Sequence, residues 1–115
     1  MKEYLLLFRN IPGNGQYVTT PEDMAEDMPK WQDWIGNIAR QGKLVSTQPI
    51  FYEGRVISNK GIESQPSILQ NQLVAGFLIC KSDSLEEVLG WSRACPILKY
   101  TEGSVEIREM MPFAA

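Results

Sequence analysis

Residues 74–113 have the pattern of a complete strand–helix–strand unit. Residues 74–80 form a nearly continuous apolar run, which is typical of a buried strand. Asp83 and Ser84 are helix-capping residue types, and apolar residues at helical spacing follow them until Cys95 and Pro96 end the helix. Residues 104–108 then alternate polar and apolar side chains, which predicts a strand with one buried face. Helix and sheet are therefore expected in one domain.

A similar strand and helix open the chain. Residues 3–9 predict a first strand, and Thr20 with Pro21 begins a helix, because threonine caps helices and proline is tolerated in the first turn. Apolar residues recur at helical spacing over residues 24–38, and Gly42 follows as a left-handed terminator. Pro29 lacks an amide hydrogen, so we expect a kink or a restart of the helix there.

The middle of the chain predicts shorter elements. Residues 44–51 and 55–57 favour two strands joined by a turn at residues 52–54. Residues 58–73 are polar and rich in turn residues, and a connection of this length is typical of a lid or a mobile loop. A strand over 74–81, a helix over 84–93 and a strand over 103–109 complete the chain.

This element order predicts one α+β domain over residues 1–115, with a ferredoxin-like fold in which two helices cover one face of a mainly antiparallel sheet. Such a small sheet leaves its other face uncovered. Residues 110–113 and three tryptophans add more apolar surface than a two-layer domain readily buries. Two subunits that stack their sheets face to face would cover it, so we expect a homodimer.

The composition argues against several classes of partner. The net charge is −3 and the basic residues are scattered singly, so nucleic-acid binding is not expected. The apolar run at residues 4–8 is too short to span a membrane and lacks the pattern of a signal peptide, which favours a cytoplasmic protein without membrane contact. In that compartment Cys80 and Cys95 are expected to be free buried thiols rather than a disulfide.

Several segments occur in a recognisable order, among them residues 1–7, 20–24, 42–44, 94–96 and 103–108. In this order and spacing the chain resembles the YCII-related, DGPF-type proteins over nearly its whole length. The resemblance implies a ferredoxin-like subunit in a dimeric α/β barrel, with a cleft between the sheet and the helices. It also implies kinship with a few proteins that act on small aromatic or lactone compounds.

The chain departs from that family at two places. The Asp-Gly-Pro-Phe segment should precede the strand at Val74, and residues 59–66 stand there with a different sequence. The YCII branch implies a His/Asp acid–base site, and the position of its histidine corresponds to Trp31. Because the sequence contains no histidine, a histidine-dependent proton relay is excluded.

Carboxylates remain available for acid–base chemistry, since burial can raise the pKa of an Asp or Glu toward neutrality. Asp33 and Glu63 are the candidate catalytic residues nearest the expected cleft, with Glu53 beside them. For Asp33 the alternative is a solvated helix residue or an ion pair with a neighbouring base, because structural ion pairs imitate such sites.

Arginines and tryptophans are the candidate ligand-binding residues. Arg9 ends the first strand and Arg55 begins the short one, and each can hold a carboxylate or phosphate, although a salt bridge is the commoner role. Trp31 and Trp34 on the first helix can line an aromatic pocket or pack in the core. No metal site or cofactor is predicted, because histidines, clustered cysteines and spaced carboxylates are missing from the sequence.

The leading hypothesis is a dimeric domain that binds a small organic ligand, or serves as an interaction domain, and lacks histidine-based catalysis. The alternative is a cofactor-independent isomerase or lyase acting on a small aromatic or lactone substrate, with a carboxylate as the acid and Arg9 or Arg55 as the anion anchor. A third hypothesis is a structural partner protein in which residues 58–73 dock another chain.

Overall fold

A computed structural model describes residues 1–10, 21–70 and 72–113. The predicted helix cap Thr20 lies outside the described residues. In chain order the elements are β1 (Lys2–Asn10), α1 (Pro21–Arg40), β2 (Leu44–Pro49), β3 (Val56–Ser58), β4 (Gly61–Glu63), β5 (Leu73–Ser82), α2 (Leu85–Arg93), a 3-10 turn η1 (Pro96–Lys99) and β6 (Ser104–Glu109).

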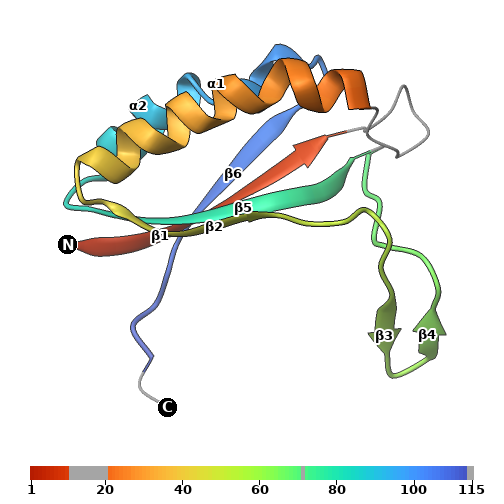
Figure 1. Ribbon diagram of the computed structural model, residues 1–115. Coiled ribbons are helices and arrows are strands. Elements are labelled where there is room, and N and C mark those ends of the chain that lie inside the picture. Colours follow the sequence, from red (N-terminus) through yellow and green to blue (C-terminus); the bar gives the residue numbers. More distant parts are fainter. Residues whose placement is uncertain (11–20, 71, 114–115) are drawn as a thin grey trace.

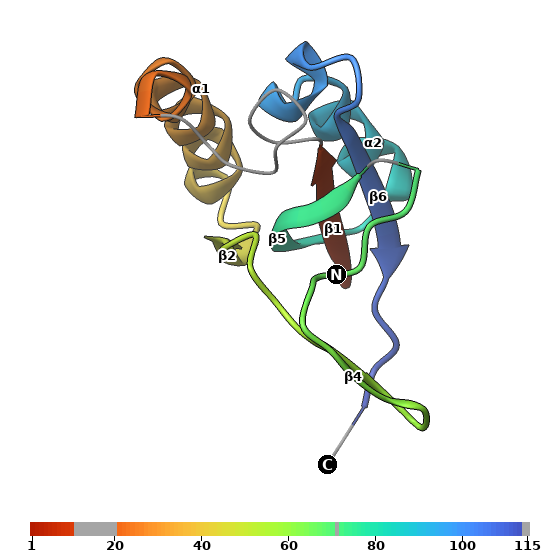
Figure 2. The same ribbon diagram turned by 90° about the vertical axis from the view of Figure 1, so that its right-hand side faces the viewer.

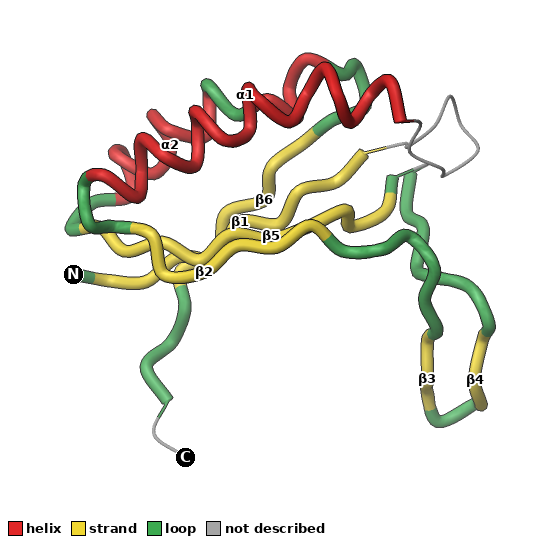
Figure 3. The backbone as a smooth tube through the Cα atoms, viewed as in Figure 1, coloured by secondary structure: helices red, strands yellow, loops and turns green. Residues whose placement is uncertain are grey.

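Four strands form an antiparallel sheet in the order β2-β5-β1-β6 (Figure 1). At its centre Leu6 of β1 lies opposite Leu78 of β5 on one side and Ile107 of β6 on the other. Both long helices lie on the same face of this sheet, as the red and yellow segments of Figure 3 show. The predicted α+β, ferredoxin-like fold is therefore confirmed.

The core lies between the sheet and the helices because side chains along a strand alternate between its two faces. In β1 the buried residues Tyr4, Leu6 and Phe8 point to the helices, and the half-buried Leu5 and Leu7 point away. The buried core consists of Tyr4, Leu6, Phe8, Trp34, Ile38, Leu78, Cys80, Val88, Cys95 and Ile97.

The predicted interruption of the first helix is wrong in one respect, since α1 does not restart at Pro29. The helix runs without a break from Pro21 to Arg40. Proline removes one helical hydrogen bond, to the carbonyl of Ala25. Both Ala25 and Pro29 are exposed, so that carbonyl is not forced into the apolar core.

Both predicted middle strands are present, as β2 and β3, but they do not pair with each other. β2 pairs with β5, and β3 pairs with β4, which lies inside the segment expected to be a loop. The hairpin turn has Gly61 at φ +128°, a conformation that glycine adopts easily, and the amide of Lys60 donates to Ser58 Oγ at 3.2 Å. Figures 1 and 2 show this hairpin projecting on the side away from the helices.

Several local predictions are confirmed. The Oγ of Ser84 accepts a hydrogen bond from the Glu87 amide at 3.2 Å and caps α2. Gly42 has φ +72° after the end of α1. Cys80 and Cys95 are free and buried. Within the described ranges, each helix is too short or too polar to cross a membrane.

Candidate functional site

Three aromatic rings meet under α1. Phe8 of β1 lies edge-on to Trp31, with ring centroids 5.0 Å apart, and to Trp34, at 5.9 Å. The two tryptophans are themselves edge-to-face at 5.7 Å, a favourable arrangement for aromatic pairs. The indole nitrogen of Trp34 donates to the carbonyl of Trp91 at 2.9 Å, which joins α1 to α2. Trp34 is therefore held in one orientation.

Beside this cluster an open groove of about 460 Å³ lies between α1 and residues 94–99. Its apolar surface comes from Trp34, Ala94, Cys95 and Pro96, and its polar residues are Lys30, Asp33 and Lys99. Burial raises the pKa of the Cys95 thiol to about 12, so this group stays neutral near pH 7. The groove thus joins an aromatic wall to nearby charged groups.

Local sequence explains how the second wall of the groove forms. Pro96 cannot continue α2 with a hydrogen bond and instead begins η1. Gly103 then lets the chain pass close to this turn, because a Cβ at that position would lie 2.0 Å from the carbonyl oxygen of Ile97. The buried side chain of Ile97 anchors the turn in the core.

One end of the groove carries a polar cluster that the sequence analysis did not identify. Lys99 Nζ and the Tyr100 hydroxyl both donate to the carboxylate of Asp27, and Lys99 also lies 3.4 Å from Glu26. Burial alone would raise the pKa of Asp27, but the hydrogen bonds from Lys99 and Tyr100 outweigh it and leave the pKa below its usual value. The hydrogen bond to Asp27 likewise raises the pKa of Lys99.

No local pattern identifies this cluster, because its members are about seventy positions apart in the sequence. Asp27 was predicted only as a possible cap for a helix restarting near Pro29, and α1 runs through it without a break. Only packing of η1 against α1 brings the three side chains together.

Among the predicted site residues, those on α1 lie at or beside the groove. Asp33 and Trp34 line it directly, while Trp31 contributes to the aromatic cluster behind it. Asp33 is exposed to solvent. Trp31 and Trp34 were predicted to line a pocket or to pack in the core. Trp34 does both: it is 8% exposed and it also lines the groove.

Arg9, a predicted ligand-binding residue, lies on the face of the sheet that points away from the helices. It follows Leu5 and Leu7 on the strand face away from the helices, and it forms an ion pair with Glu106 of β6. Arg108 reaches the same carboxylate at 3.3 Å. The hydrogen bond from Arg9, followed by that from Arg108, lowers the pKa of Glu106. Arg9 is therefore not brought to the groove.

Arg55 and Glu63 also lie away from the groove. Both are exposed, and Glu63 belongs to the projecting hairpin, opposite Val56. Arg55 lines a second hollow of about 610 Å³ at the base of that hairpin, together with Tyr52 and Pro66. Because this hollow is formed by exposed connecting segments, its shape is less constrained than that of the groove between packed elements.

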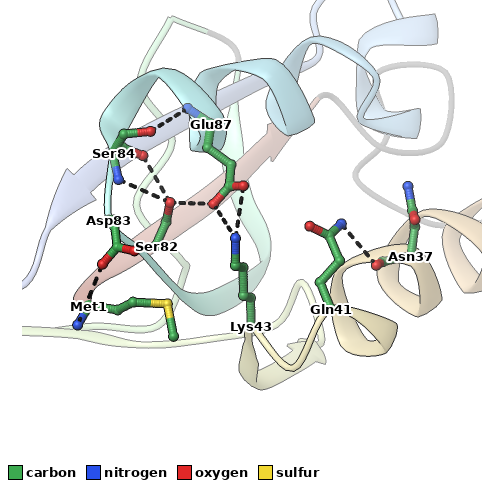
Figure 4. A network of polar contacts seen from close by, with 8 residues as sticks. All are labelled: Met1, Asn37, Gln41, Lys43, Ser82, Asp83, Ser84 and Glu87. Carbon is green, nitrogen blue, oxygen red and sulfur yellow. Dashed lines mark hydrogen bonds and ion pairs between the residues drawn. The ribbon is translucent and has the colours of Figure 1, made fainter.

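A second polar network lies at the N-terminal end of α2 (Figure 4). Lys43 Nζ donates to both carboxylate oxygens of Glu87 at 2.8 Å, and the Ser82 hydroxyl donates to the same carboxylate. These two hydrogen bonds, Lys43 first, lower the pKa of Glu87. The network joins the ends of three elements, so its evident role is structural. Across the described ranges, no cluster of three or more metal-ligating side chains occurs.

Comparison with known proteins identifies the family and the fold. The family model described as the YCII-related domain matches residues 3–114. The structure is similar to that of the 5-chloro-2-hydroxyhydroquinone dehydrochlorinase TftG from Burkholderia phenoliruptrix, in complex with 2,5-dihydroxybenzoquinone, with a TM-score of 0.59. The two are 14% identical, over 95% of this chain and 93% of that one, which establishes a shared fold. No curated protein matches the sequence.

Proposed function

The chain belongs to the YCII-related domain family, and from this premise we propose that it is a homodimeric domain that binds a small organic ligand in the groove between α1 and residues 94–99. One observation carries the proposal: an aromatic surface and charged side chains meet in a single groove between packed elements. Ligand sites combine a mainly apolar lining with a few polar groups in this way.

The dimensions support a ligand of modest size. A volume of about 460 Å³ lies within the range of small-molecule sites. Trp34 and Pro96 offer flat apolar surfaces, which favour a planar ring, and Lys30 and Asp33 can orient polar substituents. A ring of the size of 2,5-dihydroxybenzoquinone, present in the structure of TftG, is the kind of molecule we propose.

The proposed ligand binding does not use a histidine, since the sequence contains none. At the position that corresponds to the family's histidine it has Trp31, whose ring packs on Phe8 and Trp34. A proton acceptor is thereby replaced by aromatic surface. This exchange favours ligand binding over histidine-based catalysis.

The homodimer is proposed from the face of the sheet that points away from both helices. Leu5 and Leu7 of β1 lie there beside Phe77 and Ile79 of β5, which pair with them in the ladder. All four side chains are only half-buried in the single chain. A second copy that stacks its sheet on this face would remove them from water.

An alternative function, a cofactor-independent isomerase or lyase, is favoured by one observation. Asp33 lines the groove together with Lys30 and Lys99, so an acid and a cation are present in one place. The lysines would then take the anion-binding role expected of Arg9 or Arg55. In that case Asp33→Asn abolishes turnover of a bound aromatic or lactone and leaves its affinity nearly unchanged.

The proposed ligand site is tested by filling the groove. Ala94 is exposed and lines it, so Ala94→Trp inserts a large ring without removing a core contact. Ala39→Trp is the matched control, because Ala39 is an exposed residue of α1 that does not line the groove. Binding of 2,5-dihydroxybenzoquinone and of a panel of small aromatic compounds is measured by calorimetry.

We expect Ala94→Trp to weaken binding at least about tenfold, or 1.4 kcal/mol, and Ala39→Trp to bind as the wild type does. Equal affinity in both variants would place the ligand elsewhere. Native mass spectrometry of gently purified protein supplies a second readout. A species of twice 13.0 kDa is expected, with a small adduct that Ala94→Trp loses. A bare monomer would contradict the dimer, while the calorimetric comparison of the two variants decides on the ligand.

A further inference from the structure

The β3–β4 hairpin exposes apolar side chains that a stable single chain would bury. Ile57 and Ile62 lie directly opposite each other in the hairpin, and they are 77% and 68% exposed. Phe51, in the segment that leads to the hairpin, is 89% exposed. An isolated two-stranded hairpin is marginally stable in water, and each strand here has three residues. The hairpin forms a sheet of its own, separate from the four-stranded one.

The overall dimensions also indicate missing contacts. The accessible surface is 8091 Å². A folded monomer of 13.0 kDa is expected to expose about 6,300 Å², so the excess is roughly 1,800 Å². The radius of gyration is 15.2 Å, against about 13 Å for a compact chain of similar length. This excess exceeds the ~800 Å² that each partner buries in a standard interface and suits a larger homodimer interface.

The exposed segments lie on one side of the molecule. Figures 1 and 2 show the hairpin and the C-terminal tail both extending away from the sheet on the side opposite the helices. The tail carries Met111 and Phe113, which are 87% and 88% exposed. The half-buried sheet residues Leu7 and Phe77 face this same side. A partner placed under the sheet would meet the sheet, the hairpin and the tail together.

We infer that residues 50–68, which include the β3–β4 hairpin, form a dimerisation arm that packs Phe51, Ile57 and Ile62 onto a second copy of this chain. The inference rests on the homodimer proposed above and adds an interaction that sheet stacking alone does not require. In a twofold dimer each chain offers both an arm and a surface for the partner's arm, so the exchange of arms closes the assembly at two subunits.

Area and charge favour a second copy as the occupant. Phe51 and Phe113 together expose on the order of 300 Å², more than a third of what one partner buries in a standard interface. Residues 50–68 carry two acidic residues, Glu53 and Glu63, and two basic ones, Arg55 and Lys60. With no net charge on the arm, two identical arms do not repel each other across a twofold axis.

The test compares two double variants in the full chain. Ile57→Ser/Ile62→Ser removes the apolar pair of the arm. Leu85→Ser/Leu98→Ser is the control, because these residues are each 44% exposed and belong to α2 and η1, on the helix side. The dimer dissociation constant is measured by sedimentation velocity over a dilution series, and circular dichroism checks that each variant is folded.

We expect the arm variant to raise the dimer dissociation constant about 100-fold or more, and the control to change it less than threefold. Hydrogen exchange of the wild type adds a readout that needs no variant: amides of residues 56–58 and 61–63 should be protected at high protein concentration and exchange rapidly after dilution to the monomer.

If the wild type dimerises and the arm variant has the same dimer dissociation constant, the proposed role of the arm is wrong and the homodimer proposal stands. Fast exchange of the hairpin amides in that dimer would overturn the arm as well. A wild type that stays monomeric at every concentration would overturn both, whereas the binding comparison of Ala94→Trp with Ala39→Trp tests the ligand groove separately.

Discussion

Lys43 Nζ lies 2.8 Å from each carboxylate oxygen of Glu87, so one lysine just before β2 holds the first turn of α2 in a two-pronged contact. The two side chains are 23% and 31% exposed. The same lysine lies 5.8 Å from the ring centre of Trp91, one turn further along α2. Lys43 therefore joins the segment between α1 and β2 to α2, the helix that residues 94–99 follow.

Glu87→Gln should destabilise the protein by about 1 kcal/mol, because it removes the charge that Lys43 neutralises and leaves the lysine without an anionic partner. Glu86→Gln is the control. It changes a neighbouring acid of the same helical turn, which is exposed. The free energy of unfolding is measured in urea at pH 7, and equal losses in the two variants would contradict the role of the pair.

The pH dependence of that difference has a definite sign. The pKa of Glu87 is lowered in the folded protein. The ionised Glu87 carboxylate therefore stabilises the fold at pH values above its unfolded pKa of about 4.3, and this stabilisation is lost as the pH falls through the lower folded pKa. The stability gap between wild type and Glu87→Gln should therefore be constant from pH 7 to about 5 and close below pH 4. A gap that widened in acid would contradict this assignment.

Asp27→Asn should cost more stability than Glu26→Gln, although both carboxylates contact Lys99. The Asp27 side chain is 15% exposed and also accepts a hydrogen bond from Tyr100, whereas the Glu26 side chain is 65% exposed and 3.4 Å from Lys99. We expect a loss of about 1 to 2 kcal/mol for the first change and less than about 0.5 kcal/mol for the second. Chemical unfolding measures both, and the reverse order would show that the cluster does not hold η1 to α1.

Gly103→Ala and Gly90→Ala should change stability in opposite directions. A Cβ on Gly103 would meet the carbonyl oxygen of Ile97 at 2.0 Å, so the backbone must move, at a cost of about 3 kcal/mol. At Gly90, within α2, a Cβ meets nothing within 4 Å, and alanine should stabilise the helix by about 0.5 to 1 kcal/mol. Thermal unfolding measures both. Tolerance of Gly103→Ala would show that η1 and the turn before β6 can separate.

Both thiols should resist modification in the folded protein. Burial is the first cause that raises the pKa of Cys80, to about 11, and of Cys95, to about 12. At pH 8 the thiolate, which is the reactive form, is then rare in the native state, and access is blocked as well. Titration with a thiol reagent should give two rapid thiols in denaturant and almost none without it. Rapid reaction of Cys95 in the native protein, identified by mass spectrometry of the labelled peptide, would show that the groove opens at this residue.

Local patterns were sufficient for most of the fold. Alternation in β1, the apolar run of β5, the cap at Ser84 and the glycine at position 42 each depend on neighbouring residues, and each is observed. The strand partners were not predicted. β2 pairs with the distant strand β5, and β3 pairs with β4 inside a segment that was expected to be a loop.

The candidate site was predictable only in part, for the same reason. Asp33 and Trp34 are three and four positions from Lys30 on one helix, so helical spacing alone suggests that they act together. Lys99 and Cys95 enter from a segment some sixty residues away, and nothing in their own sequence connects them to α1. For Arg9 the sequence left an anion ligand and a salt bridge open, and the structure shows the salt bridge, with Glu106 on the neighbouring strand β6.

The sequence by itself determined the layers of this protein, the absence of histidine chemistry, and which faces of the strands are apolar. Periodicity and residue type are properties of short segments, so they can be read from the sequence without knowing which segments contact each other. Tertiary structure alone decided that Asp27, Lys99 and Tyr100 meet, that Arg9 and Trp34 lie on opposite faces of the sheet, and that residues 56–63 project as a hairpin. The first two of these depend on packing between segments distant in the chain, which no local pattern encodes.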